Sequence, residues 1–581
     1  MVNCIAERVE MLRDYLRRNG LCAFIFPSTD PHQGEYVPEH WQTRQWISGF
    51  DGSAGTAVVT LSDAALWTDS RYFIAASEQL EGTPFQLMKD GLPETPRISD
   101  WIIGQIVNSQ WSMVNEKTVG IDGNVFTPAE IEEMEAAFGK AGIKLRTDLD
   151  PAETLWTDRP PIPKNKVEVQ PLEFAGESAE SKIERVRQAL REQKTDCLVI
   201  SQLDEIAWLL NMRGSDVHCN PVFVSYVLLT LDDVTLFIDN EKLDKETSDY
   251  LKGIGVKVKP YSQFKPSIRQ LVNLSTCQLS PIPSMKSIKN AAEIEGFKRA
   301  MVRDGVAMVK FFRWLKPAVE AGKETELSID RKLTALRAEQ ALYRGLSFDT
   351  IAAYGPHGAI VHYEAIPESD VVLEPKGLLL LDSGAQYQDG TTDITRTIAL
   401  GPLTDEERLD YTLVLKGHIR LALSRFPDGI SGTQIDAFAR YAMWQHGINF
   451  GHGTGHGVGS YLCVHEGPHQ IRHTWKPAPL HAGMTVTNEP GIYRQGKHGV
   501  RIENTMLIIE DGETEFGKFL RLEPLTLCPI DLTPVVWELM TPEEITYLNA
   551  YHKKVFETLS PHLDEEEKQW LNVQFSILNV Q

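Results

Sequence analysis

The stretch Gly377-Leu-Leu-Leu-Leu-Asp382-Ser-Gly384, with Thr392-Asp393-Ile-Thr-Arg-Thr397 following shortly after it, decides the fold of the C-terminal half of the chain. Four consecutive leucines indicate a strand that is buried on both faces, and this strand ends on a carboxylate. Asp389-Gly390 is a turn signal between the two segments, so the sequence predicts a bulged hairpin. In such a hairpin Asp382 and Asp393 can face one pocket; a turn cap and a solvated side chain are the alternatives for each residue alone.

Helices and hairpin-forming strands alternate around this stretch. Apolar residues at helical spacing predict a long amphipathic helix over residues 291–316. Further helices are expected over 405–425, 431–446 and 547–559, and strands over 377–382, 393–400, 484–489 and 500–509. The pattern is typical of an α+β domain, which we place at residues 284–581 with a C-terminal extension from about 530.

The N-terminal half contains two stretches that resemble each other in order. Each has an apolar strand, a tryptophan-bearing segment and a second strand that ends on aspartate. The first copy has Cys22-Ala-Phe-Ile-Phe26, Trp46 and Leu66-Trp-Thr-Asp69, and the second has Cys197-Leu-Val-Ile200, Trp208 and Leu236-Phe-Ile-Asp239. We predict two similar α/β domains, at 1–157 and 158–283, with chance similarity as the alternative.

Composition excludes several classes of partner. The 581 residues carry a net charge of −22, which repels phosphate backbones, so no nucleic-acid partner is expected. The seven cysteines form no C-x-x-C pair, which favours a reducing compartment. No apolar stretch reaches about 18 residues, so we expect no membrane contact and a cytoplasmic location.

Histidines are concentrated in Gly451-His452-Gly-Thr-Gly-His456-Gly-Val-Gly459. Five glycines in nine residues exclude a stable helix, so the two histidines are not the pair of a helical zinc site. Glycine instead lets the backbone approach another group closely. The nearby His465-Glu466-Gly-Pro-His469 matches H-E-x-x-H, but its central Gly-Pro breaks a helix, so we reject a zinc-peptidase site there.

Two further carboxylates lie near strand ends. Glu489 ends one predicted strand before Pro490, and Arg501 and Glu503 are two residues apart, so they share a face if residues 500–509 form one strand. If the pair points inward, the charge of Arg501 lowers the pKa of the Glu503 carboxylate and keeps it ionised. The alternative is that Arg501 and Glu503 form a surface salt bridge. Carboxylates with one imidazole suit a pair of hard divalent ions such as Mn²⁺, which can share a hydroxide and polarise a carbonyl.

With these residues the chain resembles the pita-bread (creatinase/aminopeptidase) metallopeptidases, and in particular their three-domain aminopeptidase P group. The resemblance also rests on Ile47-Ser-Gly-Phe-Asp-Gly-Ser-Ala-Gly55, Trp67-Thr-Asp-Ser-Arg-Tyr-Phe73, Trp208-Leu-Leu-Asn-Met-Arg-Gly214, Val361-His362-Tyr363 and the segment through Pro468. It implies two creatinase-like α/β domains followed by a pita-bread catalytic domain. The implied reaction is hydrolysis of the bond between an N-terminal residue and a penultimate proline.

The resemblance also implies roles for individual residues. The metal ligands would be Asp382, Asp393, His456, Glu489 and Glu503. Asp393 and Glu503 would bridge two divalent ions, expected to be Mn²⁺, together with a hydroxide. Asp382 would hold one ion, and His456 and Glu489 the other, with Arg501 behind the ligands.

Residues around the metals would act on the substrate, a peptide with proline at position two. His362 and His465 would contact substrate and move protons, His452 would bond the substrate backbone, Glu489 would act as acid and base, and Arg71 would bind substrate. A homodimer is expected. The alternatives are a prolidase, which cleaves dipeptides, and a catalytically inactive pita-bread module that binds peptides or histones.

Overall fold

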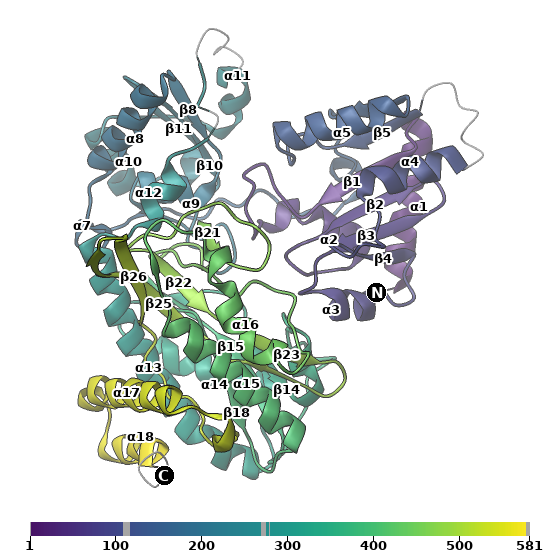
Figure 1. Cartoon of the computed structure of the whole chain (residues 1–581). Helices are drawn as coiled ribbons and strands as arrows, with labels where there is room; N and C mark the ends of the chain where they lie inside the picture. The colour runs from purple at the N-terminus through teal and green to yellow at the C-terminus, as the bar shows by residue number, and fades with distance from the viewer. Residues whose placement is uncertain (1, 109–116, 269–274, 278, 577–581) are drawn as a thin grey trace.

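The computed structural model describes residues 2–108, 117–268, 275–277 and 279–576. Figure 1 shows three parts: a first α/β unit at the right, a second at the upper left, and below the second a large unit that ends in the yellow C-terminal helices. In the described part of the chain, no helix combines the length and apolar character needed to cross a bilayer.

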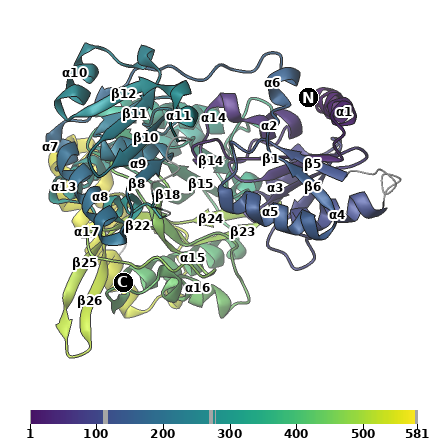
Figure 2. The same ribbon diagram turned by 90° about the horizontal axis from the view of Figure 1, so that it is seen from above.

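The first unit is a six-stranded sheet in the order β4-β3-β2-β1-β5-β6. Its elements are α1 (Val2–Asn19), β1 (Ala23–Pro27), η1 (Glu39–Trp41), α2 (Thr43–Ser48), β2 (Thr56–Thr60), β3 (Ala64–Thr68), α3 (Phe73–Gln79), β4 (Phe85–Lys89), α4 (Ile98–Asn108), β5 (Lys117–Ile121), α5 (Pro128–Lys140), β6 (Ile143–Arg146) and α6 (Ala152–Leu155). β1 is buried along its whole length, as its apolar sequence requires. Helices cover the sheet on its two faces (Figure 2).

The second unit has a four-stranded sheet in the order β12-β11-β10-β8. Its elements are β7 (Glu168–Val169), α7 (Leu172–Ala175), α8 (Ala179–Gln193), β8 (Cys197–Ile200), α9 (Leu203–Leu209), β9 (Met212–Arg213), β10 (Ser225–Thr230), β11 (Val234–Ile238), η3 (Asn240–Lys242), α10 (Lys245–Gly253), β12 (Val256–Pro260), η4 (Tyr261–Gln263), α11 (Phe264–Ile268) and α12 (Ile282–Ser287).

The two units repeat one topology. β1 to β4 pair as antiparallel, antiparallel and parallel, and β8, β10, β11 and β12 pair in the same sequence of directions. In the first unit β5 pairs in parallel with β1, and in the second unit a parallel bridge between Cys197 and Thr276 occupies the equivalent position. The prediction of two similar α/β domains is therefore confirmed.

The third unit has helices that pack in pairs and several small antiparallel sheets. Its elements up to the first hairpin are α13 (Ala291–Glu320), α14 (Glu326–Ala338), β13 (Tyr343–Leu346), β14 (Ile351–Tyr354), η5 (Gly355–Ala359), β15 (Leu378–Ser383), β16 (Ala385–Tyr387), β17 (Gly390–Thr391) and β18 (Ile394–Ala399). α13 begins after Asn290, whose side chain accepts hydrogen bonds from two backbone N–H groups of the first turn. The predicted long helix is thus present and runs one turn further.

The remaining elements complete the third unit. They are α15 (Asp405–Ala422), β19 (Arg425–Pro427), η6 (Gly432–Gln434), α16 (Asp436–Trp444), β20 (Gly455–Gly457), β21 (Glu466–Ile471), β22 (Thr485–Asn488), β23 (Gly491–Arg494), β24 (His498–Arg501), β25 (Asn504–Thr514), β26 (Gly517–Pro524), η7 (Trp537–Leu539), α17 (Pro542–Leu559), η8 (Ser560–His562) and α18 (Glu565–Ser576). Because Glu466 begins a strand, the rejection of a helical H-E-x-x-H site is confirmed.

Two expectations for this unit are wrong. Residues 500–509 are not one strand, because β24 ends at Arg501 and β25 begins at Asn504. The break arises because the backbone N–H of Glu503 donates to the carbonyl of Thr395 on β18, at 3.0 Å. Residues 431–446 are also not one helix: a 3-10 turn (η6) precedes α16.

The C-terminal extension is tied to the centre of the third unit through one buried arginine. Arg396 on β18 donates to the carbonyls of Pro529 and Cys528, at 3.0 and 2.8 Å, and to the hydroxyl of Tyr551 on α17, at 3.0 Å. It also donates to the carbonyl of Glu503, at 2.6 Å. The extension therefore supports the strand that directly follows Asp393, and the same arginine holds the backbone at Glu503.

Candidate metal centre

Two kinked hairpins bring four carboxylates together. β15 pairs with β18, and the same two chain segments continue past a kink as β16 and β17. Asp382 and Asp393 lie at this kink. β22 and β25 form the second hairpin, which continues past its own kink as β23 and β24. Glu489 and Glu503 lie in the two breaks, opposite each other.

Glycine makes the first kink possible. A Cβ atom on Gly384 would lie 2.1 Å from the carbonyl oxygen of Thr392 and 2.1 Å from Oγ of Ser347. No larger residue fits there, so the two segments can cross closely. The predicted hairpin is therefore confirmed, but it has no bulge: the register continues unbroken from Ser383↔Ile394 to Gln386↔Thr391, and the chain kinks at Gly384.

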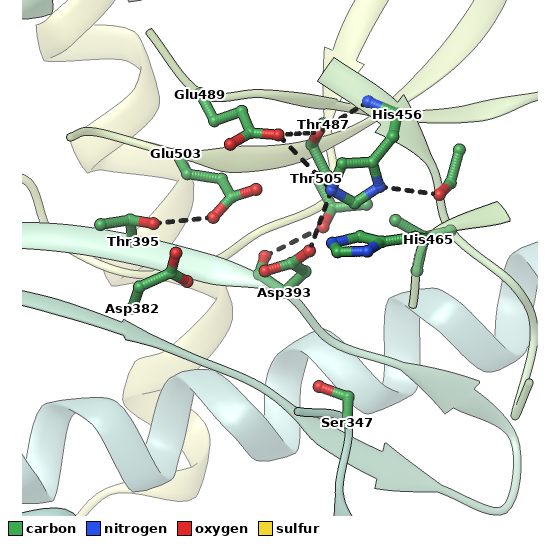
Figure 3. A network of polar contacts seen from close by, with 12 residues as sticks. Ser347, Asp382, Asp393, Thr395, His456, His465, Thr487, Glu489, Glu503 and Thr505 are labelled. Atoms are coloured by element: carbon green, nitrogen blue, oxygen red, sulfur yellow. Dashed lines mark hydrogen bonds and ion pairs between the residues drawn. The ribbon is translucent and has the colours of Figure 1, made fainter. Parts of the chain in front are cut away.

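The predicted ligand atoms converge on one space (Figure 3). Nε2 of His456 on β20 lies 3.5 Å from Oδ2 of Asp393 and 3.4 Å from Oε1 of Glu489. One ligand atom from each of Asp382, Asp393 and Glu503 also lies within 4.8 Å of the others, and so do those of His456, Glu489 and Glu503. The structure thus brings together all five residues that the resemblance assigned to metal.

The hydrogen bonds of His456 fix which ring nitrogen faces the carboxylates. Nδ1 lies 2.9 Å from the carbonyl oxygen of Gly457, which can only accept, so Nδ1 carries the proton. Nε2 then directs a lone pair at Asp393 and Glu489. Burial, followed by the charge of His465, lowers the pKa of His456 to about 3, so the ring does not gain a second proton. This is the usual arrangement of a metal-binding histidine.

The carboxylates repel one another strongly. Burial raises the pKa of Asp393 well above its usual value, and the charges of Asp382 and Glu489 raise it further. Burial also raises the pKa of Glu503 well above its usual value, and the charge of Asp393 raises it further. Burial and the charge of Asp382 raise the pKa of Glu489 to about 7, although Arg501 opposes this. Such a cluster is stable with all groups ionised only when cations neutralise it.

One orphaned atom supports a metal at this position. Oδ1 of Asp382 is buried and has no hydrogen-bond partner, whereas Oδ2 accepts from Arg501 Nη2 at 2.6 Å. A buried carboxylate oxygen without a partner is costly, and a cation satisfies it. Four carboxylates and one neutral imidazole therefore fit a pair of hard divalent ions.

Threonines and an arginine orient the ligands. Thr395 donates to Glu503 at 2.9 Å and Thr487 donates to Glu489 at 3.1 Å, so both carboxylates keep their second oxygen free. Arg501 is buried and pairs with Asp382, not with its neighbour Glu503, because the strand break turns Glu503 away. The alternative of a surface salt bridge for Arg501 is thereby excluded.

The hydroxyl of Tyr493 links His452 to Arg501 by two hydrogen bonds. Its Nε2 accepts from the hydroxyl of Tyr493 at 2.7 Å, and that hydroxyl accepts from Arg501 Nη1 at 2.7 Å. Its Nδ1 donates to the carbonyl of Gly453, at 2.7 Å. Both ring nitrogens of His452 are therefore bonded within the protein, and its contact with substrate stays a prediction.

The first unit reaches the centre with three side chains. Glu35 accepts from His465 Nδ1 at 2.8 Å and lies 3.5 Å from Arg71 Nη1, and the hydroxyl of Tyr72 lies 2.7 Å from His362 Nδ1. Burial alone would lower the pKa of His465, but the charge and hydrogen bond of Glu35 raise it to about 9. His465 is therefore protonated at neutral pH, with its ring centroid 4.4 Å from that of His456.

His362 differs from His465 in charge. Burial, with the charges of Arg71 and Arg501, lowers its pKa well below the usual range. Arg71 itself is held by two hydrogen bonds to Asp69, at 3.0 and 2.8 Å. The structure thus places a neutral histidine, a charged histidine and an arginine at one side of the carboxylate cluster.

Several residues of this site, among them Tyr72, Tyr493 and Glu35, were not predicted from the sequence. Tyr72 adjoins Arg71 in a quoted motif, and Tyr493 follows the Pro-Gly that breaks β22 from β23, so position alone hints at both. Glu35 has no such signal, because it lies in a loop far from every ligand in sequence. Only the domain arrangement brings it to His465, 430 residues later.

Comparison with known families agrees with this geometry. The model of metallopeptidase family M24 matches residues 295–510, and a model of its C-terminal region matches 518–576. The Creatinase/Prolidase N-terminal domain matches twice, at 8–152 and 158–279. Xaa-Pro aminopeptidase 1 of Dictyostelium discoideum is 38% identical, and the alignment covers 99% of this chain and 97% of the relative. The chain belongs to the M24 metallopeptidases.

Other M24 relatives match over the same length. Aminopeptidase P1 of Arabidopsis thaliana is 37% identical over 98% of both chains. The crystal structure of X-prolyl aminopeptidase from Caenorhabditis elegans, described as a cytosolic enzyme with a di-nuclear active site, superposes with a TM-score of 0.93 at 34% identity, covering 98% of this chain and 99% of that one. The predicted fold class, two creatinase-like domains followed by the catalytic domain of M24 enzymes, is confirmed.

Proposed function

We propose that this M24 metallopeptidase is an exopeptidase that removes the N-terminal residue from peptides whose second residue is proline. The observation that carries the proposal is the convergence of four carboxylates and one neutral imidazole. The full-length similarity to Xaa-Pro aminopeptidases supports the specificity for proline.

The proposed centre holds two divalent ions, for which we favour Mn²⁺ because the ligands are mostly oxygen. Asp393 and Glu503 would contact both ions, Asp382 one of them, and His456 with Glu489 the other. When bound, such a pair activates a water molecule and polarises the scissile carbonyl.

The remaining steps fall to side chains of this chain. His465, held charged by Glu35, can donate to the carbonyl oxygen as negative charge develops on it. Glu489, which lies 3.4 Å from Nε2 of His456, can take a proton from the water and deliver it to the proline nitrogen. That transfer is essential because a prolyl nitrogen has no proton of its own. His362 and Arg71 would position the substrate, and His452 would bond its backbone in exchange for the bond to Tyr493.

Other features of the proposal concern the protein as a whole. We propose a cytoplasmic homodimer, domain boundaries near residues 157 and 283, and an extension from about 530. Sedimentation should give a mass near twice the 65.3 kDa of one chain, and a mass of one chain would contradict the dimer.

The direct test is a comparison of substrates after loading with Mn²⁺. We expect release of the first residue from Xaa-Pro-Xaa tripeptides and little cleavage of Xaa-Ala-Xaa tripeptides, measured by chromatography of products. Preference for Xaa-Pro dipeptides would instead indicate a prolidase. An absence of proline-dependent cleavage, with peptide binding retained, would favour the inactive binding module.

The second prediction concerns the bridging ligand. Asp393→Asn removes a charge from the centre, so bound metal should fall from two ions toward one or none, and turnover should fall by about 10³-fold or more. Metal analysis and kcat are the measurements. Asp158→Asn makes the same change at an exposed position and should retain both. Full turnover in Asp393→Asn would refute the two-metal centre.

A further inference from the structure

A second group of ligating side chains lies outside the M24 centre. One ligand atom from each of His218, Cys219 and Asp349 lies within 4.8 Å of the others. Nε2 of His218 is 2.8 Å from Oδ1 of Asp349. Neither the proposed reaction nor the family motifs use these residues, so their juxtaposition requires its own explanation.

The backbone presents two of the three side chains from a tight turn. His218 and Cys219 are the central residues of a turn that an antiparallel bridge between Val217 and Asn220 closes. Cys219 has a φ of +58°, in the left-handed region that residues other than glycine and asparagine seldom adopt. The carbonyl of Cys219 accepts from Gln386 Nε2 on β16, at 3.3 Å. The turn of the second unit is thus held against the catalytic unit.

The third side chain comes from the catalytic unit. Asp349 lies in the short connection between β13 and β14, where Ser347 anchors the backbone by donating to the carbonyl of Thr392, at 2.8 Å. The cluster therefore joins two domains. Its His218 is exposed and its Cys219 is half-buried, so ions can enter from solvent.

The electrostatic surroundings favour a cation. Burial raises the pKa of the nearby Glu364, and the charges of Asp349 and Asp51 raise it further. Burial also raises the pKa of the Cys219 thiol, and Asp349 and Glu364 act in the same direction, although the hydrogen bond and charge of His218 oppose them. The thiol is thus protonated when no ion is present, which argues against a role as a free nucleophile.

We propose that His218, Cys219 and Asp349 form a third metal site, which takes a borderline-soft divalent ion such as Zn²⁺ and links the second domain to the catalytic domain. A thiolate, an imidazole and a carboxylate are the ligands that Zn²⁺ prefers, in contrast to the oxygen-rich M24 centre.

The distances allow the site to form with small movements. Tetrahedral zinc with bonds of about 2.0–2.3 Å separates its ligand atoms by about 3.3–3.8 Å. Binding releases the thiol proton and the proton shared by His218 and Asp349, and a water molecule completes the fourth position.

Cobalt provides a readout that the M24 centre cannot give. Its five predicted ligands supply only oxygen and nitrogen, so a thiolate-to-Co²⁺ charge-transfer band reports on a cysteine site. We expect the full-length protein to develop this band on titration with Co²⁺, and Zn²⁺ to abolish it. Cys219→Ser should lose the band and bind one Zn²⁺ fewer than the wild type, whereas Cys4→Ser, at an exposed cysteine, should match the wild type.

The result that supports the site is loss of the band in Cys219→Ser with retention in Cys4→Ser. His218→Ala should weaken Zn²⁺ binding at least tenfold without changing the M24 centre. Absence of the band from the wild type, its persistence in Cys219→Ser, or its loss in Cys4→Ser overturns the proposal. These readouts do not depend on peptidase activity, so they stand apart from the proposed function.

Discussion

Glu35 sets the charge of His465, although the two residues belong to different domains. The carboxylate accepts from Nδ1 at 2.8 Å, and Arg71 and Ser53 hold it in place from the other side. His465 consequently keeps its proton in a buried position where an isolated histidine would lose it. The first domain thus acts on the chemistry of the catalytic domain through one hydrogen bond.

Glu35→Gln should therefore change the pH dependence of the reaction. Without the carboxylate, burial lowers the pKa of His465 from about 9 to below its ordinary value, so the ring is neutral at about pH 8. We expect kcat to fall by about 10- to 100-fold at about pH 8 and less at about pH 6, where protonation is partly restored.

Metal content separates this effect from damage to the ligands. Glu35→Gln should bind metal as the wild type does, and Glu39→Gln, at an exposed position nearby, should leave the pH profile unchanged. An equal loss of kcat at both pH values would contradict the assigned role of Glu35.

The residue scale also shows where sequence-based prediction ends. All five ligands could be predicted because each lies in a motif with a local signal, such as leucines before Asp382 or glycines around His456. Glu35 and Tyr72 act across a domain boundary, and no local pattern encodes which loop will meet His465. The pairing of Arg501 with Asp382 instead of Glu503 depends on a strand break that periodicity does not reveal.

At the scale of elements, the short strand β20 determines where His456 lies. It packs flush against β22: a Cβ atom on Gly455 would lie 1.9 Å from the carbonyl oxygen of Thr487. The backbone N–H of His456 donates to Oγ1 of Thr487 at 3.0 Å, and that of Glu489 donates to the carbonyl of Thr454 at 2.8 Å. The imidazole and Glu489 are thereby fixed to each other.

Gly455→Ala should separate these strands. The added methyl group forces β20 away from β22, which should destabilise the protein by about 1–3 kcal/mol and weaken metal binding at least tenfold. Calorimetry and metal titration measure the two effects. Gly453→Ala is the matched control, because its Cβ atom would meet its nearest neighbours at an ordinary 3.5 Å. Equal metal affinity in the two variants would refute this role for β20.

Element boundaries were predictable only where one signal dominates. The buried leucines of β15 and the apolar face of α13 were sufficient to predict both elements. The kinks in the two hairpins were not fully predictable, because the sequence from Val500 to Ile509 reads as one strand through the break between β24 and β25. The break exists because the chain bonds to β18, a contact distant in sequence.

At the scale of the molecule, a buried ion network joins the second domain to the catalytic domain. Nζ of Lys286 lies 2.8 Å from Glu466 and 2.8 Å from Asp204, and Lys289 also pairs with Glu466. Glu466 adjoins His465, so the network supports the segment that carries this histidine. The α/β fold is duplicated, which the sequence shows only as a weak repeat. The first copy contacts the site through Glu35, and the second pairs with the segment that carries His465.

Lys286→Met should test this network. Removing one partner leaves buried carboxylates with less compensation, so the free energy of unfolding should fall by about 3 kcal/mol. Lys298→Met breaks an exposed pair with Glu295 and should cost less than about 1 kcal/mol. Urea unfolding of both variants makes the comparison, and similar midpoints would contradict the importance of the network.

The bonds of Arg396 have a consequence for the order in which the protein is made. A nascent chain reaches the last carboxylate of the centre at Glu503, but Arg396 still lacks Cys528, Pro529 and Tyr551. Until these residues have been synthesised, the guanidinium of Arg396 lacks three of its hydrogen-bond acceptors, so burying it against β18 is unfavourable. The backbone around Asp393 and Glu503 therefore gains its full set of supporting bonds only after residue 551 has been synthesised.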